Sequence, residues 1–304
     1  MKKILINTST FNKNNLQTDY FINNNIELIY NKFNRKLTEL ELYDIIDDNV
    51  IGLIAGVEPI TKKILEKAVS LKVISRCGIG MDNVDLNTAK ILGIQVINTP
   101  NAPVDAVVEL TFGHIFSLLR KITESDRYIR DANWKPLYGN LFKGKNIGII
   151  GFGRIGKKMA EISNYFGANV LVYDPFYKTN LNTYKFVDFN NLIKESDIIT
   201  LHIPYNIDTH HIIGSFEFSL MKSNTLLINI SRGGLIDEKA LYDALFENKI
   251  AGAALDCFES EPYTGNFTKL NNIQMTAHMG SYAKETRDVM ESEAIKNLIT
   301  LLNQ

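Results

Sequence analysis

Cysteine, net charge and long hydrophobic runs are all scarce in this chain of 304 residues, and each scarcity excludes a class of protein. The two cysteines, Cys77 and Cys257, lie far apart and form no metal-ligand pattern, which favours a reduced cytoplasmic setting. A formal net charge of -1 provides no basic footprint for nucleic acid or an anionic membrane. No apolar run reaches the roughly 20 residues of a membrane span, and the run after the two lysines of MKKILIN is too short for a signal peptide. We therefore expect a cytoplasmic protein with no nucleic-acid partner, no membrane partner and no metal.

Short apolar runs alternate with helical patterns along the chain, which is typical of α/β proteins with parallel sheets. Strands are predicted first at residues 3–7, 26–30, 50–55, 72–76 and 94–99. A second series follows at residues 146–151, 168–174, 184–188, 197–202, 225–231, 251–256 and 273–277. A long amphipathic helix over Val104–Lys121 separates the two series.

The last helical pattern, over residues 281–302, has no further strand of its own to cover. We expect this helix to return to the first series of strands. The sequence therefore predicts one discontinuous domain, formed by residues 1–99 and 281–304, and an inserted domain over residues 100–280. Ligands often bind in the cleft between two such domains.

A glycine-rich turn opens the inserted domain. Gly151, Gly153 and Gly156 have the G-x-G-x-x-G spacing between a predicted strand and a predicted helix. Such glycines allow a tight turn, close approach of a pyrophosphate and close packing of the helix on the strand, while the helix N-terminus attracts phosphate. Asp174 ends the next strand, where a carboxylate holds ribose hydroxyls and repels a 2′-phosphate. The position of the glycines between a strand and a helix favours a dinucleotide-binding turn over a plain glycine turn. Asp174 favours NAD over NADP.

Three later segments each place a polar side chain where a strand should end. They carry Arg232 in INISRGG, Glu261 in LDCFESEP and His278 in MTAHMGS. Because the carboxyl ends of parallel strands line the ligand crevice, these side chains could converge beside the nicotinamide. Arg232 could then hold a carboxylate or a carbonyl oxygen, His278 could transfer a proton, and Glu261 could orient the ring and stabilise its charged form. The set suits interconversion of an alcohol and a ketone beside a carboxylate.

Taken singly, each of these residues has a commoner structural interpretation, as a strand-end hydrogen-bonding group, a loop residue or a cap. The other four histidines also favour that interpretation. His114 lies within the long helix, His202 ends a strand near the expected adenine side, and His210 and His211 lie in a polar loop.

The chain resembles the D-isomer-specific 2-hydroxyacid dehydrogenases over essentially its whole length. The resemblance rests on the stretches SRCGIGMDNVDL, NTPNAPVDAVVELT, GIIGFGRIG, VYDP, INISRGGLIDEKAL, LDCFESEP and TAHMGSYAKET. It implies two doubly wound parallel-sheet domains, with a Rossmann NAD-binding domain inserted into a discontinuous flavodoxin-like substrate domain. It also implies a homodimer, formed through the long helix and the inserted domain.

The resemblance implies a role for further residues. Arg232 would contact the substrate, Glu261 the histidine, and His278 would act as acid and base. Backbone N–H groups of one loop would bind the substrate carboxylate as an anion-binding nest. The loop residues are Gly78, Ile79 and Gly80.

On the cofactor side, the resemblance implies that Asp256 contacts the nicotinamide carboxamide and that Arg154 and Ile155 approach the pyrophosphate. Gly280, two residues beyond the histidine, is also expected to contact the cofactor.

Within the family, the long helix and the last helix look closest to the phosphoglycerate dehydrogenase branch, but without its C-terminal regulatory domain. Val57 and Glu58 occupy the place where several of those enzymes carry an arginine for the substrate phosphate. Glu58 would repel a phosphate, so either Arg76 substitutes or the substrate has none. Ala277 replaces the usual proline, which should alter loop stiffness more than chemistry.

Three functions therefore remain open. The chain is expected to transfer a hydride between NAD and a D-2-hydroxy acid or 2-keto acid, with 3-phosphoglycerate as one candidate substrate. Reduction of glyoxylate or hydroxypyruvate is the alternative within the family. An NAD-sensing binding protein is the alternative outside enzymes, because a fold alone does not determine function.

Overall fold

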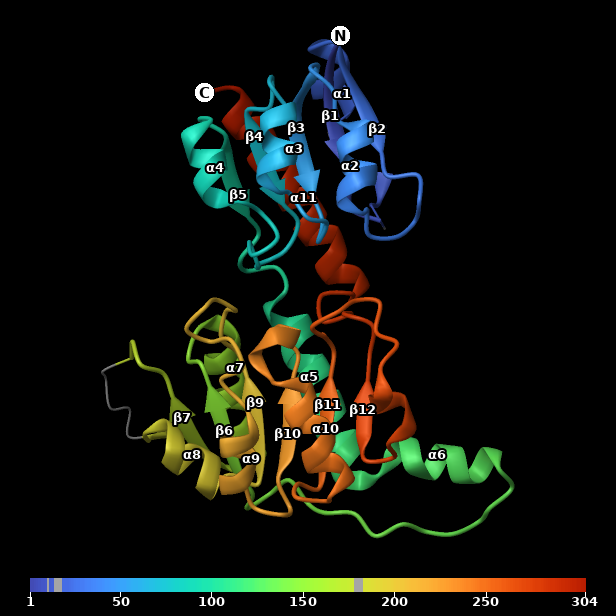
Figure 1. Ribbon diagram of the computed structural model, residues 1–304, viewed down its shortest axis with the longest axis vertical. Helices are drawn as coiled ribbons and strands as arrows, with labels where there is room; N and C mark the ends of the chain where they lie inside the picture. The colour runs from blue at the N-terminus through green and yellow to red at the C-terminus, as the bar shows by residue number, and fades with distance from the viewer. Residues whose placement is uncertain (10, 14–17, 178–182) are drawn as a thin grey trace. The chain divides into compact units, whose positions relative to one another are not determined.

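The computed structural model describes residues 1–9, 11–13, 18–177 and 183–304 (Figure 1). The chain divides into two compact units: unit 1 consists of Met1–Pro103 and Ser281–Gln304, and unit 2 of Val104–Gly280. Unit 2 begins at Val104, whereas the sequence predicted that the inserted domain begins at residue 100.

Unit 1 is built on a parallel sheet. Its strands are β1 (Lys2–Ile6), β2 (Ile26–Tyr30), β3 (Val50–Ala55), β4 (Val73–Arg76) and β5 (Gln95–Asn98). They are ordered β2-β1-β3-β4-β5, and every neighbouring pair is parallel. This is the flavodoxin-like order, in which the chain moves to one side of β1 and then to the other. The carboxyl ends of β1 and β3 therefore flank the switch point where such sheets bind ligands.

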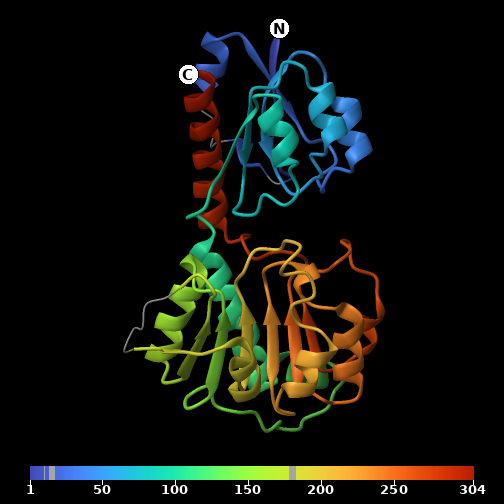
Figure 2. The same cartoon turned by 60° about the vertical axis from the view of Figure 1, so that its left-hand side comes forward.

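Helices cover both faces of this sheet (Figure 2). They are α1 (Thr18–Asn23), α2 (Glu39–Ile45), α3 (Lys62–Lys67), α4 (Leu86–Ile91) and α11 (Lys284–Leu302). Buried side chains of α2, α3 and α4 pack on one face, and those of α1 and α11 pack on the other. The last helix is fixed by Met290, Ile295 and Leu298 in the core and by a hydrogen bond of 2.7 Å from Ser75 Oγ to Ala294 O.

Unit 2 contains the larger sheet. Its strands are β6 (Asn146–Ile150), β7 (Asn169–Tyr173), β8 (Lys185–Phe186), β9 (Ile198–Leu201), β10 (Leu226–Asn229), β11 (Gly252–Leu255) and β12 (Ile273–Met275). They are ordered β12-β11-β10-β9-β6-β7-β8, again with parallel neighbours. The order reverses between β6 and β9, so the switch point lies at the carboxyl end of β6. The predicted class, with two doubly wound parallel sheets, is confirmed.

The helices of unit 2 also form two layers. They are α5 (Val104–Arg120), α6 (Ile122–Arg130), α7 (Arg154–Tyr165), α8 (Phe189–Glu195), α9 (Ser215–Leu220) and α10 (Glu238–Phe246), with 3-10 helices η2 (Gly233–Leu235) and η3 (Asn266–Lys269). Side chains of α5 and α7 fill the core on one face, and those of α8, α9 and α10 fill it on the other. Within the residues that the structure describes, every helix is too short or too polar to span a bilayer.

Candidate active site

The three glycines of the turn between β6 and α7 are required for three different reasons. Gly151 has φ +98°, and a Cβ there would lie 2.5 Å from the His202 carbonyl oxygen. A Cβ on Gly156 would lie 2.0 Å from the Gly151 carbonyl oxygen, so this glycine lets α7 pack on the strand. A Cβ on Gly153 would meet no atom within 4 Å, so packing inside the chain does not explain this glycine.

Space beside Gly153 is what a bound pyrophosphate needs. Gly153 is the N-cap of α7 and supplies no side-chain hydrogen bond to the helix, whose first residues are Arg154 and Ile155. The first amides of the helix and its positive dipole end can therefore meet an anion. The turn fits a dinucleotide, and Gly153, Arg154 and Ile155 are the residues that would hold its phosphates.

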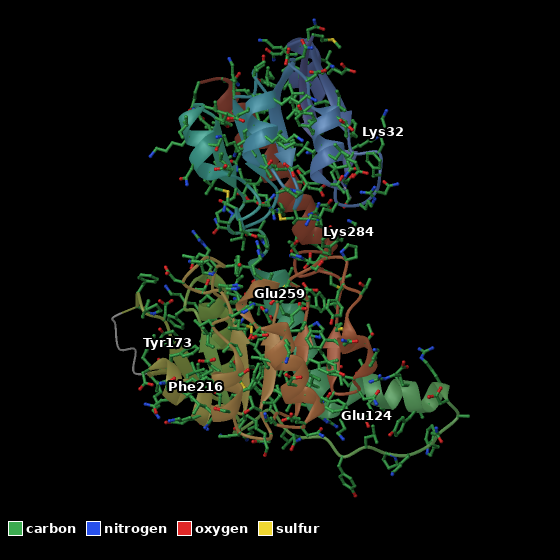
Figure 3. All side chains as sticks on the ribbon, in the orientation of Figure 1. Lys32, Glu124, Tyr173, Phe216, Glu259 and Lys284 are labelled. Atoms are coloured by element: carbon green, nitrogen blue, oxygen red, sulfur yellow. The ribbon has the colours of Figure 1, made fainter. Side chains whose placement is uncertain are left out.

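Asp174 follows β7 and lies beside this turn. Its Oδ2 accepts a hydrogen bond of 2.7 Å from the Phe152 amide inside the glycine motif, and its Oδ1 accepts one of 2.9 Å from the Phe176 amide. The carboxylate is thus fixed next to the turn, where its negative charge disfavours a 2′-phosphate. Tyr173, the last residue of β7, marks this edge of unit 2 (Figure 3).

Asp256 organises the segment that carries His278. Its Oδ1 accepts hydrogen bonds from Thr276 Oγ1 at 2.5 Å and the Met279 amide at 2.8 Å, and its Oδ2 accepts one from the Gly280 amide at 2.8 Å. Its carbonyl oxygen accepts the His278 amide at 2.8 Å. Because the Gly280 amide is already bonded, Gly280 offers the cofactor no free donor; Asp256 keeps spare acceptor capacity on Oδ2.

His278 and Glu261 are in direct contact. His278 Nδ1 lies 3.0 Å from Glu261 Oε1 and 2.9 Å from Oε2, and Oε1 also accepts the Phe258 amide at 3.1 Å. A carboxylate accepts only, so Nδ1 carries the proton in this contact. The Nε2 atom makes no hydrogen bond to the described part of the chain, and a third of the side chain is exposed. Nε2 is therefore the nitrogen that can exchange a proton with a ligand.

Arg232 follows β10 and precedes η2. Its Nη1 donates to the Ser231 carbonyl oxygen at 2.7 Å, and its own carbonyl oxygen accepts from Asn229 Nδ2 at 2.8 Å. The strands β10, β11 and β12 are neighbours in the sheet, so the segments carrying Arg232, Glu261 and His278 leave adjacent carboxyl ends of one sheet. The topology therefore brings the three segments to one edge of the unit 2 sheet, and the joint action of their side chains stays a prediction.

Two further contacts at this edge were not predicted. A Cβ on Gly233 would lie 1.9 Å from the Phe258 carbonyl carbon, so the segment after Arg232 touches the loop that carries Glu261. His114 reaches this edge from α5, with Nε2 3.2 Å from Thr276 Oγ1, and burial lowers its pKa. Neither contact has a local signal, because the partners lie far apart in the sequence.

The loop between β11 and Glu261 is also held by hydrogen bonds of Glu259. Glu259, labelled in Figure 3, accepts His211 Nε2 at 2.7 Å through its Oε1 and donates its amide to Glu238 Oε1 at 2.8 Å. Burial raises the pKa of Glu238, and the charge of Glu259 adds to that shift. His211, predicted to be a plain loop residue, therefore helps to position the loop between β11 and Glu261.

In unit 1, the predicted carboxylate nest needs a correction. The Gly78 amide donates to Thr99 Oγ1 at 2.8 Å, so it is not free for a ligand. The amides of Ile79 and Gly80 make no hydrogen bond within the described residues, while the Ile79 carbonyl oxygen accepts Asn98 Nδ2 at 2.7 Å. The two free amides, and not three, form the candidate anion-binding loop.

The sequence predicted Glu58 as a loop carboxylate that repels a phosphate, and Arg76 as a cation that could bind one. The structure places both side chains differently. Both are buried, with 1% and 5% of their surfaces exposed. Glu58 Oε1 accepts the Gly56 amide at 3.0 Å, and the Arg76 guanidinium donates to the Cys77 carbonyl oxygen. Val57 is the more exposed residue of that loop. Among the described residues, no group of three or more His, Cys, Asp or Glu side chains is arranged to hold a metal ion.

Together, the two sheets and the glycine turn define an α/β protein with a dinucleotide-binding unit and a polar edge on each sheet. Residues 112–280, more than half of the chain, match the family model described as the D-isomer-specific 2-hydroxyacid dehydrogenase NAD-binding domain. The chain belongs to the D-isomer-specific 2-hydroxyacid dehydrogenase family, and is an NAD-dependent oxidoreductase of 2-hydroxy and 2-keto acids.

Individual relatives point in the same direction. The chain is 41% identical over 255 residues to the glyoxylate reductase of Thermococcus litoralis, covering 80% of this chain and 77% of that protein. It is 38% identical over 286 residues to the D-3-phosphoglycerate dehydrogenase of Methanocaldococcus jannaschii, covering 88% of this chain and 55% of that protein. Its fold matches the TT0316 protein of Thermus thermophilus with a TM-score of 0.89 and 31% identity, over 99% of this chain and 97% of the other.

Proposed function

We propose that this chain reduces a small, unphosphorylated 2-keto acid such as glyoxylate or hydroxypyruvate, with Arg232, Glu261 and His278 as its catalytic residues. The contact of both Glu261 oxygens with His278 Nδ1, which leaves Nε2 without a partner among the described residues, is the observation that carries the proposal. Unit 2 binds the cofactor in this proposal, and unit 1 is the substrate domain.

The proposed roles follow from the contacts of each side chain. When held by unit 2, NADH would supply the hydride for the carbonyl carbon of the substrate. Glu261 fixes the tautomer and orientation of the His278 ring, so Nε2 gives its proton to the carbonyl oxygen. Arg232 presents a planar fork to the oxygen and carboxylate of the substrate, stabilising the negative charge that develops. In the reverse direction, Nε2 takes the proton from the hydroxyl group.

The cofactor contacts follow from the turn and from two strand ends. The amides at Gly153, Arg154 and Ile155 would meet the pyrophosphate, Asp174 the adenosine ribose, and Asp256 the carboxamide through its spare acceptor on Oδ2. Gly151, Gly156 and Gly280 act on backbone geometry, and do not touch the cofactor through side chains.

An unphosphorylated substrate is favoured by the loop after β3 in unit 1. That loop offers Val57 and the buried Glu58 where a phosphate would need a cation, and Arg76 is buried and bonded to its own loop. The similarity to a glyoxylate reductase agrees with this choice. 3-Phosphoglycerate oxidation remains the competing activity, and it would need a phosphate contact from elsewhere in the chain.

The test is steady-state oxidation of NADH with glyoxylate, hydroxypyruvate, pyruvate and 3-phosphohydroxypyruvate, with His278→Gln as the inactive control. The expected result is a higher kcat/KM for glyoxylate or hydroxypyruvate than for the phosphorylated acid. Preference for the phosphorylated acid would transfer the assignment to the phosphoglycerate branch. Tight NADH binding with no turnover of any acid would favour the NAD-sensing alternative.

We also propose that the protein acts as a homodimer in the cytoplasm. The segment after α6 exposes Trp134 to 90%, Tyr138 to 96% and Leu141 to 71%, an unusual display of apolar surface for a lone chain. Cys77 and Cys257 are buried free thiols, as expected in a reducing compartment. Light scattering should give about twice the chain mass of 34.4 kDa, and Trp134→Ser with Tyr138→Ser should lower it.

A further inference from the structure

A buried pair of opposite charges lies at the carboxyl edge of the unit 1 sheet, and the proposed chemistry does not use it. Arg76 ends β4 and Glu58 follows β3, its neighbour in the sheet. Arginine and glutamate side chains are almost never buried to this extent unless they are paired. Burial raises the pKa of Glu58, while its backbone hydrogen bonds, Asn7 and the positive charge of Arg76 oppose that rise.

The Arg76 guanidinium lies directly against the loop that follows it. Its Nη1 donates to the Cys77 carbonyl oxygen, and a Cβ on Gly78 would lie 2.1 Å from Nη1 and 2.9 Å from Cζ. Gly78 also has φ +141°, which an L side chain rarely adopts. The loop is therefore wrapped around the guanidinium, and only a glycine permits that approach.

The opposite side of the same loop is held by the segment after β5. Thr99 Oγ1 accepts the Gly78 amide at 2.8 Å, the Thr99 amide donates to the Gly78 carbonyl oxygen at 3.1 Å, and Asn98 Nδ2 donates to the Ile79 carbonyl oxygen at 2.7 Å. With the carbonyl groups of Gly78 and Ile79 fixed in this way, the amides of Ile79 and Gly80 are left for a ligand.

Glu58 is held just as firmly. Its Oε1 accepts the Gly56 amide at 3.0 Å, and Asn83 Nδ2 donates to the carbonyl oxygens of Gly56 at 3.2 Å and Glu58 at 2.7 Å. The Asn7 carboxamide is close enough to affect the Glu58 carboxyl, although neither of its polar atoms forms a hydrogen bond of normal geometry. The Glu58 carboxyl group is thus held in place within unit 1, near enough to Arg76 to feel its positive charge.

We infer that Arg76 is a positioning residue for substrate binding: with Glu58 as its counter-charge, it holds the loop Cys77–Gly80 so that the Ile79 and Gly80 amides face a substrate carboxylate. This inference rests on the proposed function. It assigns to Arg76 an effect on the affinity for the acid and none on hydride or proton transfer. The positive charge beneath an anion-binding loop acts in the same direction as the amides.

The test compares Arg76→Met, Glu58→Gln and the double variant. Each single change leaves one buried charge without its counter-charge and is expected to lower the melting temperature; the double change removes both charges and is expected to restore part of it. In the double variant, KM for glyoxylate should rise about tenfold or more while kcat stays within about threefold, because the amide contacts weaken but the chemistry is intact. The Kd for NADH should not change.

Lys72→Met is the matched control, because Lys72 is an exposed cation next to the opposite end of β4. It should leave both KM and the melting temperature at their wild-type values. Binding of oxamate to the enzyme–NADH complex, followed by fluorescence, gives a readout independent of turnover, and its Kd should rise in parallel with KM.

A folded double variant with wild-type KM and wild-type oxamate affinity would overturn the inference and leave the proposed function standing. If the wild-type chain instead turns over no 2-keto acid and binds no oxamate, the proposed function fails first, and the inference fails with it.

Discussion

Replacing Gly233 with alanine tests whether the segment of Arg232 sets the position of Glu261. Gly233 does not have a positive φ, so alanine is permitted by the backbone and the effect is steric. The new Cβ would lie 1.9 Å from the Phe258 carbonyl carbon and 2.3 Å from the Glu259 amide nitrogen. Since real Cβ contacts stay above 3.0 Å, the segment of Gly233 and the loop at Phe258 must separate by about 1.1 Å (3.0 − 1.9).

This displacement would act on the loop that presents Glu261 to His278 across 2.9–3.0 Å. The overlapping atoms are backbone atoms, so no side chain can turn aside to absorb it. A misplacement of about 1 Å can cost about 10²-fold in rate, and overpacking costs about 1–3 kcal/mol of folding free energy. We therefore expect kcat to fall by about 10²-fold, with a loss of several degrees in melting temperature and unchanged NADH affinity.

The assay is steady-state glyoxylate reduction, together with NADH fluorescence titration and a thermal melt. Gly113→Ala is the control, because a Cβ at this position in α5 would meet no atom within 4 Å and alanine favours a helix. Wild-type kcat in folded Gly233→Ala would show that Glu261 is not held by this contact. Loss of NADH binding would show that the damage extends beyond the loop.

Three further changes separate chemistry, cofactor binding and stability. His278→Gln should lower kcat by ~10²–10⁴-fold at unchanged NADH affinity, and undiminished kcat would remove His278 from the mechanism. Gly153→Ala should melt like the wild type but bind NADH more weakly, because its Cβ enters open space that the pyrophosphate needs; equal NADH affinity would contradict the cofactor placement. Burial lowers the pKa of His202 to about 3, so between pH 6 and 4 only the unfolded chain takes up a proton at this residue. The free energy of unfolding of the wild type should therefore fall, relative to that of His202→Gln, by about 1.4 kcal/mol for each pH unit of acidification in this range. Urea unfolding of both proteins at several pH values measures this slope, and parallel curves would refute it.

The fold could be predicted because each unit repeats one simple pattern. Apolar runs such as those of β6 and β10 are too short for buried helices, and the helical patterns between them supply the crossovers of a parallel sheet. Parallel neighbours place all carboxyl ends at one edge. The proximity of Glu261 and His278 then follows from their positions after β11 and β12, without knowledge of the side-chain contacts.

The contacts that support the site could not be predicted in this way. The Gly78 amide is taken by Thr99, 21 residues later, and His114 meets Thr276 across 162 residues. Nothing near Gly78 or His114 in the sequence marks these partners, because they are brought together by the packing of separate elements. Glu58 illustrates the same limit, since a charged residue in a loop is expected to be exposed, yet here the loop folds over it.

Asp256 has a structural role that the sequence did not reveal. The family resemblance implies a cofactor contact for Asp256, and three donors from the segment after β12 already bind its carboxylate. His278 has φ +51°, a backbone conformation that costs about 1–3 kcal/mol for a non-glycine residue unless its surroundings fix it. The hydrogen bonds of Asp256 to the neighbouring amides supply that constraint. The orientation of the His278 ring is therefore set by Glu261 from the side chain and by Asp256 from the backbone, and both follow the same strand.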